Sequence, residues 1–216
     1  SLAFFVRTPL RARDSVIAGF LCALSVAIGQ QMVPAVATLA AIVGLRWVVD
    51  GDRCRRATVA FGISIASGAA ILAAATIAPA GYFTIHCDAI SIAQVGALGL
   101  GGFGLAAIAA LPRLNSIVRR LVAAGGLAVL LAVSIKFGAP QCLGDPYAQL
   151  DPRLADLWLS SVDKARDFAA MMRDLPYTVP AYFGLPLAAL ALCIIHCLHE
   201  KGQQRWKWIA CAASQA

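Results

Sequence analysis

The fold of this chain is decided by one uncharged stretch, SVIAGFLCALSVAIGQQMVPAVATLAAIVGL, which occupies residues 15–45. As a single α-helix it would form a rod of about 46 Å, longer than the roughly 30 Å hydrocarbon core of a bilayer. Four residues interrupt the stretch near its middle: Gly29, Gln30, Gln31 and Pro34. We therefore predict two short membrane spans, at about 15–29 and 33–49, joined by a tight turn. One kinked and tilted helix is the alternative.

Arginines on both sides of this stretch decide between the two arrangements. Three precede it and four follow it: Arg7, Arg11 and Arg13, then Arg46, Arg53, Arg55 and Arg56. Loops that stay in the cytoplasm carry an excess of Lys and Arg. A hairpin places both clusters in the cytoplasm, whereas a single span would place one of them outside. The charges therefore favour the hairpin.

Four further segments reach the length of about 20 apolar residues that a span needs. They cover residues 57–78, 92–111, 121–139 and 179–198. Together with the hairpin they predict six spans with both ends cytoplasmic, and residues 206–216 resemble the start of a seventh. The predicted fold class is thus an all-α integral membrane protein, with residues 1–216 as one transmembrane domain in a bacterial inner membrane. Since both ends look cut, we expect a fragment of a longer protein.

The composition supports a membrane protein and argues against other classes. Hydrophobic residues make up 60% of the chain and charged residues 13%, with a mean hydropathy of +0.77. Ordinary globular domains have about 45–50% apolar and about 25% charged residues. A net charge of +7 could indicate nucleic-acid binding, but the charges lie between apolar runs, which is the membrane pattern. We expect membrane lipids as partners and no nucleic acid.

The segment from residue 140 to 176 is too long for a simple connection and lies on the predicted outer side. Asp151 and Pro152 are suited to the cap and first position of a helix, and apolar residues including Trp158 then recur at helical spacing. The pattern predicts an amphipathic helix on the periplasmic surface. It would either cover apolar span ends or form a lid over a lipid-linked substrate.

Two of the seven cysteines, Cys87 and Cys142, fall in predicted outer loops, whereas the others map to spans or to the cytoplasmic side. Periplasmic cysteines can oxidise, and small outer loops gain order from a disulfide. We predict that the two form a disulfide if the spans bring their Cα atoms within about 7 Å. Two unpaired thiols are the alternative.

Five polar or aromatic residues near the outer side are candidates for substrate binding: Gln30, Gln31, His86, Asp88 and Trp158. The two glutamines could bind a polar headgroup or satisfy open backbone groups of the turn. His86 and Asp88 lie at the predicted mouth, where ionisable groups are often functional, but could equally cap the span that starts near Ile92. None of these residues forms a catalytic set, so we predict no catalytic residue.

Two other patterns resemble sites without the context that a site requires. Residues 99–104 match G-x-G-x-x-G, but they lie inside an apolar span, where glycines more often let a neighbouring helix approach closely. Cys193, His196, Cys197 and His199 share one helix, which cannot place four ligands tetrahedrally around zinc. We predict no metal site and no cofactor.

Three segments carry a resemblance to a known group of proteins: AGFLCALSVAIG at 18–29, HCDAIS at 86–91, and QCLGDPYAQLDP at 141–152 followed by LWL at 157–159. They resemble proteobacterial multispan proteins that are similar to GT-C-type glycosyltransferases. The resemblance implies transfer from a polyprenyl-phosphate-linked sugar at the periplasmic face. The catalytic Asp of that pattern lies in the first outer loop, and nothing here matches that loop. No catalytic residue is therefore carried over.

Two other function classes stay open. A transporter or flippase-like protein would place polar groups in the middle of its spans, and Gln30, Gln31 and Gln94 offer little of this. A non-catalytic membrane scaffold needs no such groups. Transfer assays on the full-length protein would separate a scaffold from an enzyme.

Overall fold

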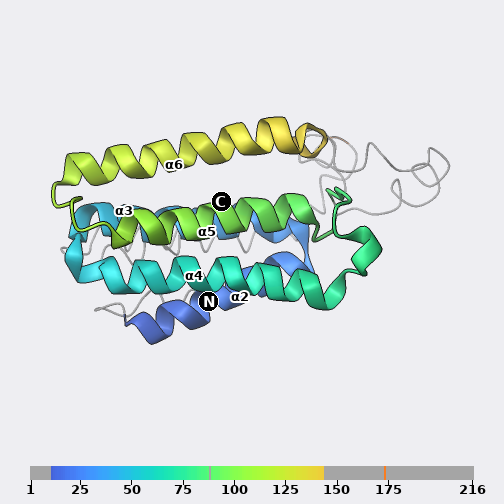
Figure 1. Cartoon of the computed structure of the whole chain (residues 1–216), viewed down its shortest axis with the longest axis horizontal. Coiled ribbons are helices and arrows are strands. Elements are labelled where there is room, and N and C mark those ends of the chain that lie inside the picture. Colours follow the sequence, from blue (N-terminus) through green and yellow to red (C-terminus); the bar gives the residue numbers. More distant parts are fainter. Residues whose placement is uncertain (1–10, 88, 144–172, 174–216) are drawn as a thin grey trace. The chain divides into compact units, whose positions relative to one another are not determined.

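The computed structural model describes residues 11–87, 89–143 and 173, and the first two ranges form a bundle of helices (Figure 1). Its α-helices are α2 (Ala12–Ile28), α3 (Val33–Asp50), α4 (Asp52–Thr76), α5 (Ile92–Ala110) and α6 (Ile117–Gly138). Three short 3-10 turns join or follow them: η1 (Gln30–Met32), η2 (Pro79–Gly81) and η3 (Pro140–Leu143). No strand occurs in these ranges.

Among the described residues, four helical segments are long and apolar enough to cross a membrane: Gln30–Asp50, Asp52–Thr76, Ile92–Ala110 and Ile117–Gly138. The chain is thus a helical, membrane-embedded protein. Helix α2 has 17 residues, or about 25 Å at 1.5 Å per residue, and is shorter than these four. The chain divides into two units, Ser1–Gly144 and Asp145–Ala216, and the five α-helices that the structure describes belong to the first. The predicted span at 179–198, the seventh span and the outer helix within 140–176 lie outside the described helices.

The predicted break in the first apolar stretch is confirmed. Helix α2 ends at Ile28, and the N–H of Gly29 still donates to the carbonyl oxygen of Ser25. One 3-10 turn, η1, then leads directly into α3. The two helices run in opposite directions (Figure 1), as a hairpin requires and a single kinked helix does not.

The boundary between α3 and α4 differs from the predicted one. We expected a cytoplasmic loop that carries Arg53, Arg55 and Arg56, but α4 already begins at Asp52, so that these arginines form its first turns. The connection is the single residue Gly51, whose φ of +60° is a conformation that glycine adopts without strain. The sequence pattern places the start of a span at its first apolar residue, whereas the helix itself continues into the polar interface.

Helices α2, α4 and α5 pack at backbone distance. A methyl group added at Gly19 of α2 would lie 2.7 Å from the carbonyl oxygen of Phe61 in α4, and one at Gly102 of α5 would lie 2.5 Å from that of Gly62. The Ser64 hydroxyl also donates to the carbonyl oxygen of Val16, at 2.6 Å. Membrane helices associate through such close packing and interhelical hydrogen bonds, because lipid supplies no hydrophobic force between them.

The predicted role of the glycines in α5 is confirmed for some of them and wrong for others. Gly102 meets α4, while Gly101 and Gly104 face Leu131 and Leu127 of α6. A side-chain carbon added at Gly96 or Gly99 would meet nothing within 4 Å, so these two glycines allow no close helix contact among the described residues.

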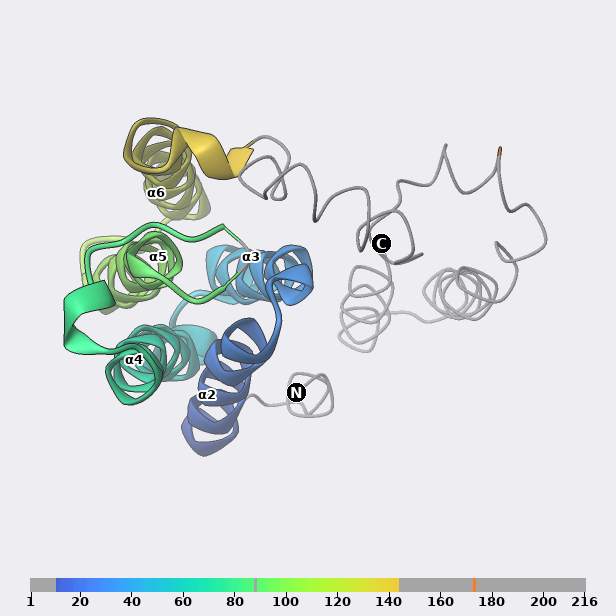
Figure 2. The same ribbon diagram turned by 90° about the vertical axis from the view of Figure 1, so that its right-hand side faces the viewer.

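Helix α6 is attached differently from the others. Figure 2 shows α5 and α3 between α6 on one side and α4 and α2 on the other. The only buried residue of α6 is Arg120, whereas α4 buries eleven residues. Arg120 lies near the first turn of α6 and donates from Nη1 to the carbonyl oxygen of Trp47, at 2.9 Å. The middle of α6 therefore contributes little to the core.

We predict that Gly102→Leu destabilises the bundle while Gly99→Leu, one turn away on the same helix, does not. The larger side chain at position 102 would push α5 away from α4, and overpacking of this kind costs about 1–3 kcal/mol. The measurement is the unfolding midpoint of the detergent-solubilised protein. Equal midpoints for the two variants would contradict the close packing of α4 and α5.

Candidate functional site

An apolar groove of about 620 Å³ lies between α3, α5 and α6. Its floor is formed by Val26 of α2 and by Phe61 and Ile65 of α4. Its volume falls within the roughly 300–1,000 Å³ that small-molecule sites occupy. Leu45 and Leu121 on its margins are 48% and 55% exposed, so the groove is open along one side. This groove is the candidate functional site.

Small side chains on all three helices create the groove. The small residues that line it are Ala37, Ala40, Ala41 and Gly44 on α3, Ala97, Gly101 and Gly102 on α5, and Ala124, Gly125 and Ala128 on α6. Helix α6 approaches α5 through Leu127 and Leu131, which reach towards Gly104 and Gly101. These leucines keep the helices apart along their length, and the neighbouring alanines and glycines leave the space unfilled.

The lining is almost entirely apolar. Of its 23 described residues, only Gln94 has a polar side chain. That side chain is already engaged, because its Oε1 accepts from the backbone N–H and the hydroxyl of Ser91, at 3.0 and 2.5 Å, and its Nε2 donates to the carbonyl oxygen of His86, at 3.1 Å. The groove can therefore hold hydrocarbon but offers few partners to a polar molecule.

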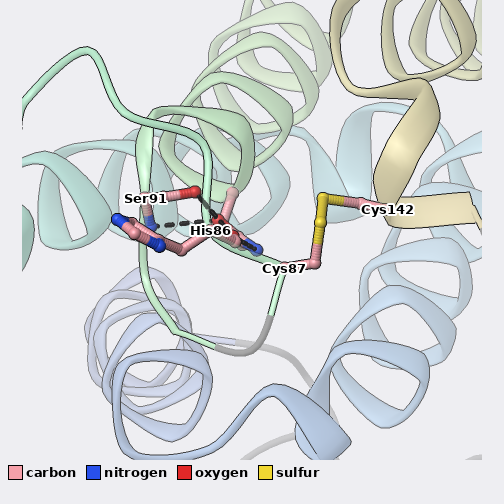
Figure 3. Close-up of a disulfide and its surroundings, with 5 residues drawn as sticks. His86, Cys87, Ser91 and Cys142 are labelled. Atoms are coloured by element: carbon pink, nitrogen blue, oxygen red, sulfur yellow. Dashed lines mark hydrogen bonds between the residues drawn. A yellow bond between two sulfur atoms is a disulfide. The ribbon is translucent and has the colours of Figure 1, made fainter. Parts of the chain in front are cut away.

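A disulfide between Cys87 and Cys142 lies at the end of the bundle where α5 begins and α6 ends (Figure 3). Their Cα atoms are 5.1 Å apart, so the condition for the predicted bond is met. The bond joins the loop before α5 to η3, the turn that follows α6. It thus attaches the far end of α6 to the bundle, opposite the attachment made by Arg120.

The residues next to this disulfide form a helix cap. Ser91 is the N-cap of α5 and forms a capping box with Gln94, and its hydroxyl oxygen also lies 2.9 Å from the carbonyl oxygen of His86 (Figure 3). The sequence left two roles open for His86 and Asp88: substrate binding, or capping of the span that starts near Ile92. In the structure, Ser91 supplies this cap. His86 contributes its backbone carbonyl, and its side chain is exposed. Asp88 lies outside the described residues.

The two glutamines of the hairpin turn lie at the same end of the bundle. Gln30 is partly buried, and its Nε2 has no hydrogen-bond partner among the described residues. Gln31 is exposed, with its amide close to Gly29. The backbone of the turn is instead closed by the N–H of Met32, which donates to the carbonyl oxygen of Gly29. The Gln30 Nε2 is thus a buried donor near the start of α3. Trp158, the remaining candidate, lies outside the described residues.

At the opposite end, arginines bind the carboxyl ends of helices. Arg55 donates from Nη2 to the carbonyl oxygen of Ala110 at the end of α5, at 2.6 Å, and Arg120 does the same for Trp47 near the end of α3. Cations are favourable there because the carboxyl end of a helix carries partial negative charge. In the sequence these arginines indicate only the side of the membrane, and this structural role was missed.

Asp14 is a further residue that the sequence pattern did not single out. It lies in the first turn of α2, is only 7% exposed, and its Oδ2 has no hydrogen-bond partner among the described residues. Ionisable residues within membrane helices are functional candidates by default. In the sequence, Asp14 stands directly before the uncharged stretch. This position could have indicated that its carboxylate falls within the first turn of the helix rather than ahead of it. It lies outside the groove lining.

The described residues contain no group of three or more metal-ligating side chains. No protein-family model, curated protein or solved structure matches this chain. The groove and its two ends are therefore the basis for any functional argument.

We predict that Cys87 and Cys142 are oxidised in the native membrane. In a variant with the other five cysteines replaced by alanine, denatured protein should take up a maleimide-linked polyethylene glycol twice after reduction and not at all before it. The mass shift on a gel measures this. Because a native disulfide typically stabilises by about 2–4 kcal/mol, the Cys142→Ala variant should also unfold at a lower temperature. Full labelling without reductant would contradict the bond.

Proposed function

We propose that this chain is the membrane-embedded portion of a GT-C-like glycosyltransferase-type protein that acts on a lipid-linked substrate at the periplasmic face of a bacterial inner membrane. The observation that carries the proposal is the apolar groove between α3, α5 and α6, which is open along one side. A lipid-linked substrate requires such a groove, because its hydrocarbon chain stays in the membrane while its headgroup reacts in water.

Two independent features support the proposed orientation. Nine of the ten Lys and Arg residues in the described bundle, residues 11–143, lie at one end of it, which the positive-inside rule assigns to the cytoplasm. The disulfide lies at the other end, and disulfides persist in oxidising compartments such as the periplasm. Charge and redox chemistry thus favour the same orientation, with Gln30, His86 and Cys87 on the outer side.

The polarity of the groove favours a lipid over a polar cargo. A pathway for a polar solute would need donors, acceptors or charges along its length. The described lining has one polar side chain, Gln94, which takes part in the helix cap. This favours a site for a lipid-linked substrate over a transporter for polar molecules.

The chemistry of transfer is assigned to residues other than those described. The resemblance to GT-C-type enzymes rests on residues 18–29, 86–91, 141–152 and 157–159, and the acid expected of that pattern has no counterpart here. In this proposal the chain binds and positions the lipid carrier, while an acidic residue elsewhere in the full-length protein activates the acceptor.

The proposal is tested by a transfer assay. Full-length protein in proteoliposomes should move radiolabelled sugar from a polyprenyl-phosphate-linked donor to an acceptor, and the product is measured after extraction of the donor lipid. A full-length variant with Gly102→Leu should lose activity together with stability, whereas Gly99→Leu should keep it. Absence of transfer from every polyprenyl-linked donor offered would leave the scaffold alternative.

The orientation makes a separate prediction. Green fluorescent protein inserted in the loop between α5 and α6, after Leu114, should fluoresce, because this reporter matures in the cytoplasm. Alkaline phosphatase inserted at Tyr82, in the loop before α5, should be active, because this enzyme requires the periplasm. Fluorescence and phosphatase activity of whole cells measure the two cases, and each reporter at the other site is the control. The reverse pattern would invert the topology and exclude action at the periplasmic face.

A further inference from the structure

We propose that the turn between α5 and α6 binds the phosphate headgroup of an anionic phospholipid, in the leaflet next to the basic end of the bundle. Three residues would hold it, the turn arginines Arg55, Arg113 and Arg119. This inference goes beyond the proposed function, because it concerns the end opposite the disulfide and holds for a transferase, a transporter or a scaffold alike. It is carried by the convergence of the turn arginines, the lack of acidic partners for them, and the apolar residues beside them.

A tight turn lies between α5 and α6. The N–H of Leu114 donates to the carbonyl oxygen of Leu111, at 3.4 Å, and Pro112 and Arg113 are the two residues between them. Proline is favoured at the first of these central positions, because its ring already fixes the φ that the turn requires. The side chain of Arg113 therefore starts at the tip of the turn, and it is exposed.

Two further guanidinium groups reach the backbone of this turn from neighbouring helices. Nη2 of Arg55, in α4, donates to the carbonyl oxygen of Ala110, at 2.6 Å. Nη1 of Arg119, in α6, donates to the carbonyl oxygen of Arg113, at 3.4 Å. A guanidinium group has five N–H donors, so each of these contacts leaves most donors available for a ligand. Three elements of the bundle thus bring three cations to one turn.

Acidic side chains do not neutralise this cluster among the described residues. The ion pair that the structure contains there joins Arg46 to Asp50 within α3, and the exposed Asp52 of α4 pairs with none of the turn arginines. Like charges that converge without a counter-charge repel one another. An anion between the three guanidinium groups would offset this repulsion, and arginine binds phosphate through two parallel N–H···O bonds.

The exposed residues beside the turn arginines are apolar. Leu111 follows the end of α5, Ile117 and Val118 form the first turn of α6, and all three are exposed. A phospholipid matches both kinds of group, since its phosphate lies at the level of the helix ends and its acyl chains lie along the spans. Basic groups at this level attract anionic lipids. A soluble phosphate compound or an acidic protein would leave the apolar side chains without a partner, so the surroundings favour the lipid.

A bound headgroup would connect α4, the turn and α6. Arg120 is the only buried residue of α6, so the start of this helix depends on few contacts with the bundle. A phosphate shared by Arg55 and Arg119 would add a link between α4 and α6 at this end. The lipid is therefore expected to stabilise the folded bundle as well as to bind it.

Two pairs of exposed arginines provide matched variants. Arg113→Gln with Arg119→Gln removes two charges at the turn. Arg11→Gln with Arg13→Gln removes two charges at the same end of the bundle, but on α2, which lies on the other side of α5 and α3 from α6 (Figure 2). Arg55 is left unchanged, because it bonds the end of α5. Since all four replaced side chains are exposed, effects on folding are matched.

The test measures lipid binding to the full chain in a non-ionic detergent by native mass spectrometry. Phosphatidylglycerol, which is anionic, should bind at least about tenfold more tightly than zwitterionic phosphatidylcholine, equivalent to about 1.4 kcal/mol. The turn pair of substitutions should reduce this preference to about twofold or less, whereas the α2 pair should leave it near tenfold. Phosphatidylglycerol should also raise the unfolding midpoint of the unsubstituted chain and of the α2 variant, but not that of the turn variant.

Equal affinities for the two lipids would overturn the inference. Equal losses in the two double variants would do so as well, because binding would then reflect the total charge of the basic end rather than the turn. Inorganic phosphate and polyglutamate are the soluble competitors. If either displaces the lipid at a similar concentration, the turn arginines bind a soluble anion or an acidic protein instead of a phospholipid.

Discussion

The close contact between Gly62 of α4 and Gly102 of α5 is the constraint on which the rest of the bundle depends. Each glycine lies against the backbone carbonyl of the other, so neither position accepts a side chain. This contact fixes the rotation of α5 about its axis. As a result, Gly101 and Gly104 face α6, and Ala97 and Gly101 face the groove. The same contact that holds α4 and α5 together therefore determines which residues line the candidate site.

Helix α6 is attached at both of its ends, and between them it meets α5 through Leu127 and Leu131. Arg120 attaches its first turn through the carbonyl oxygen of Trp47, and the disulfide of Cys142 attaches the turn after its last residue to the loop before α5. In water, an apolar gap between two such attachments would close, because burial of apolar surface is favourable. In a bilayer that force is absent, since lipid chains solvate the exposed faces as well as protein does. The two end attachments and the two leucine contacts are then sufficient to hold α6 beside an open groove.

The sequence predicted features that depend on local chemistry, and it missed those that depend on contacts between distant residues. The break at Gly29, Gln30 and Gln31 followed from helix length against membrane thickness, and α2, η1 and α3 confirm it. The start of α4 was placed too late, because hydropathy marks the hydrocarbon core and α4 extends beyond it to Asp52. The sequence could not show which glycines of α5 meet a neighbouring helix. Closely spaced glycines lie on several faces of one helix, and only the packing decides which of these faces is in contact. The groove itself could not be predicted, since it arises from small residues on three helices that only packing brings together.

The membrane lipid around the groove determines how strongly the groove can discriminate between ligands. A groove that opens to the membrane is never empty of hydrocarbon, so any ligand must displace membrane lipid that makes similar apolar contacts. Contact with Phe61, Ile65 or Leu105 thus contributes to occupancy but little to discrimination, because specificity is a difference of affinities. Discrimination between lipids must therefore come from polar groups, and Gln94, the one polar side chain of the described lining, is already bonded to Ser91 and to the carbonyl oxygen of His86.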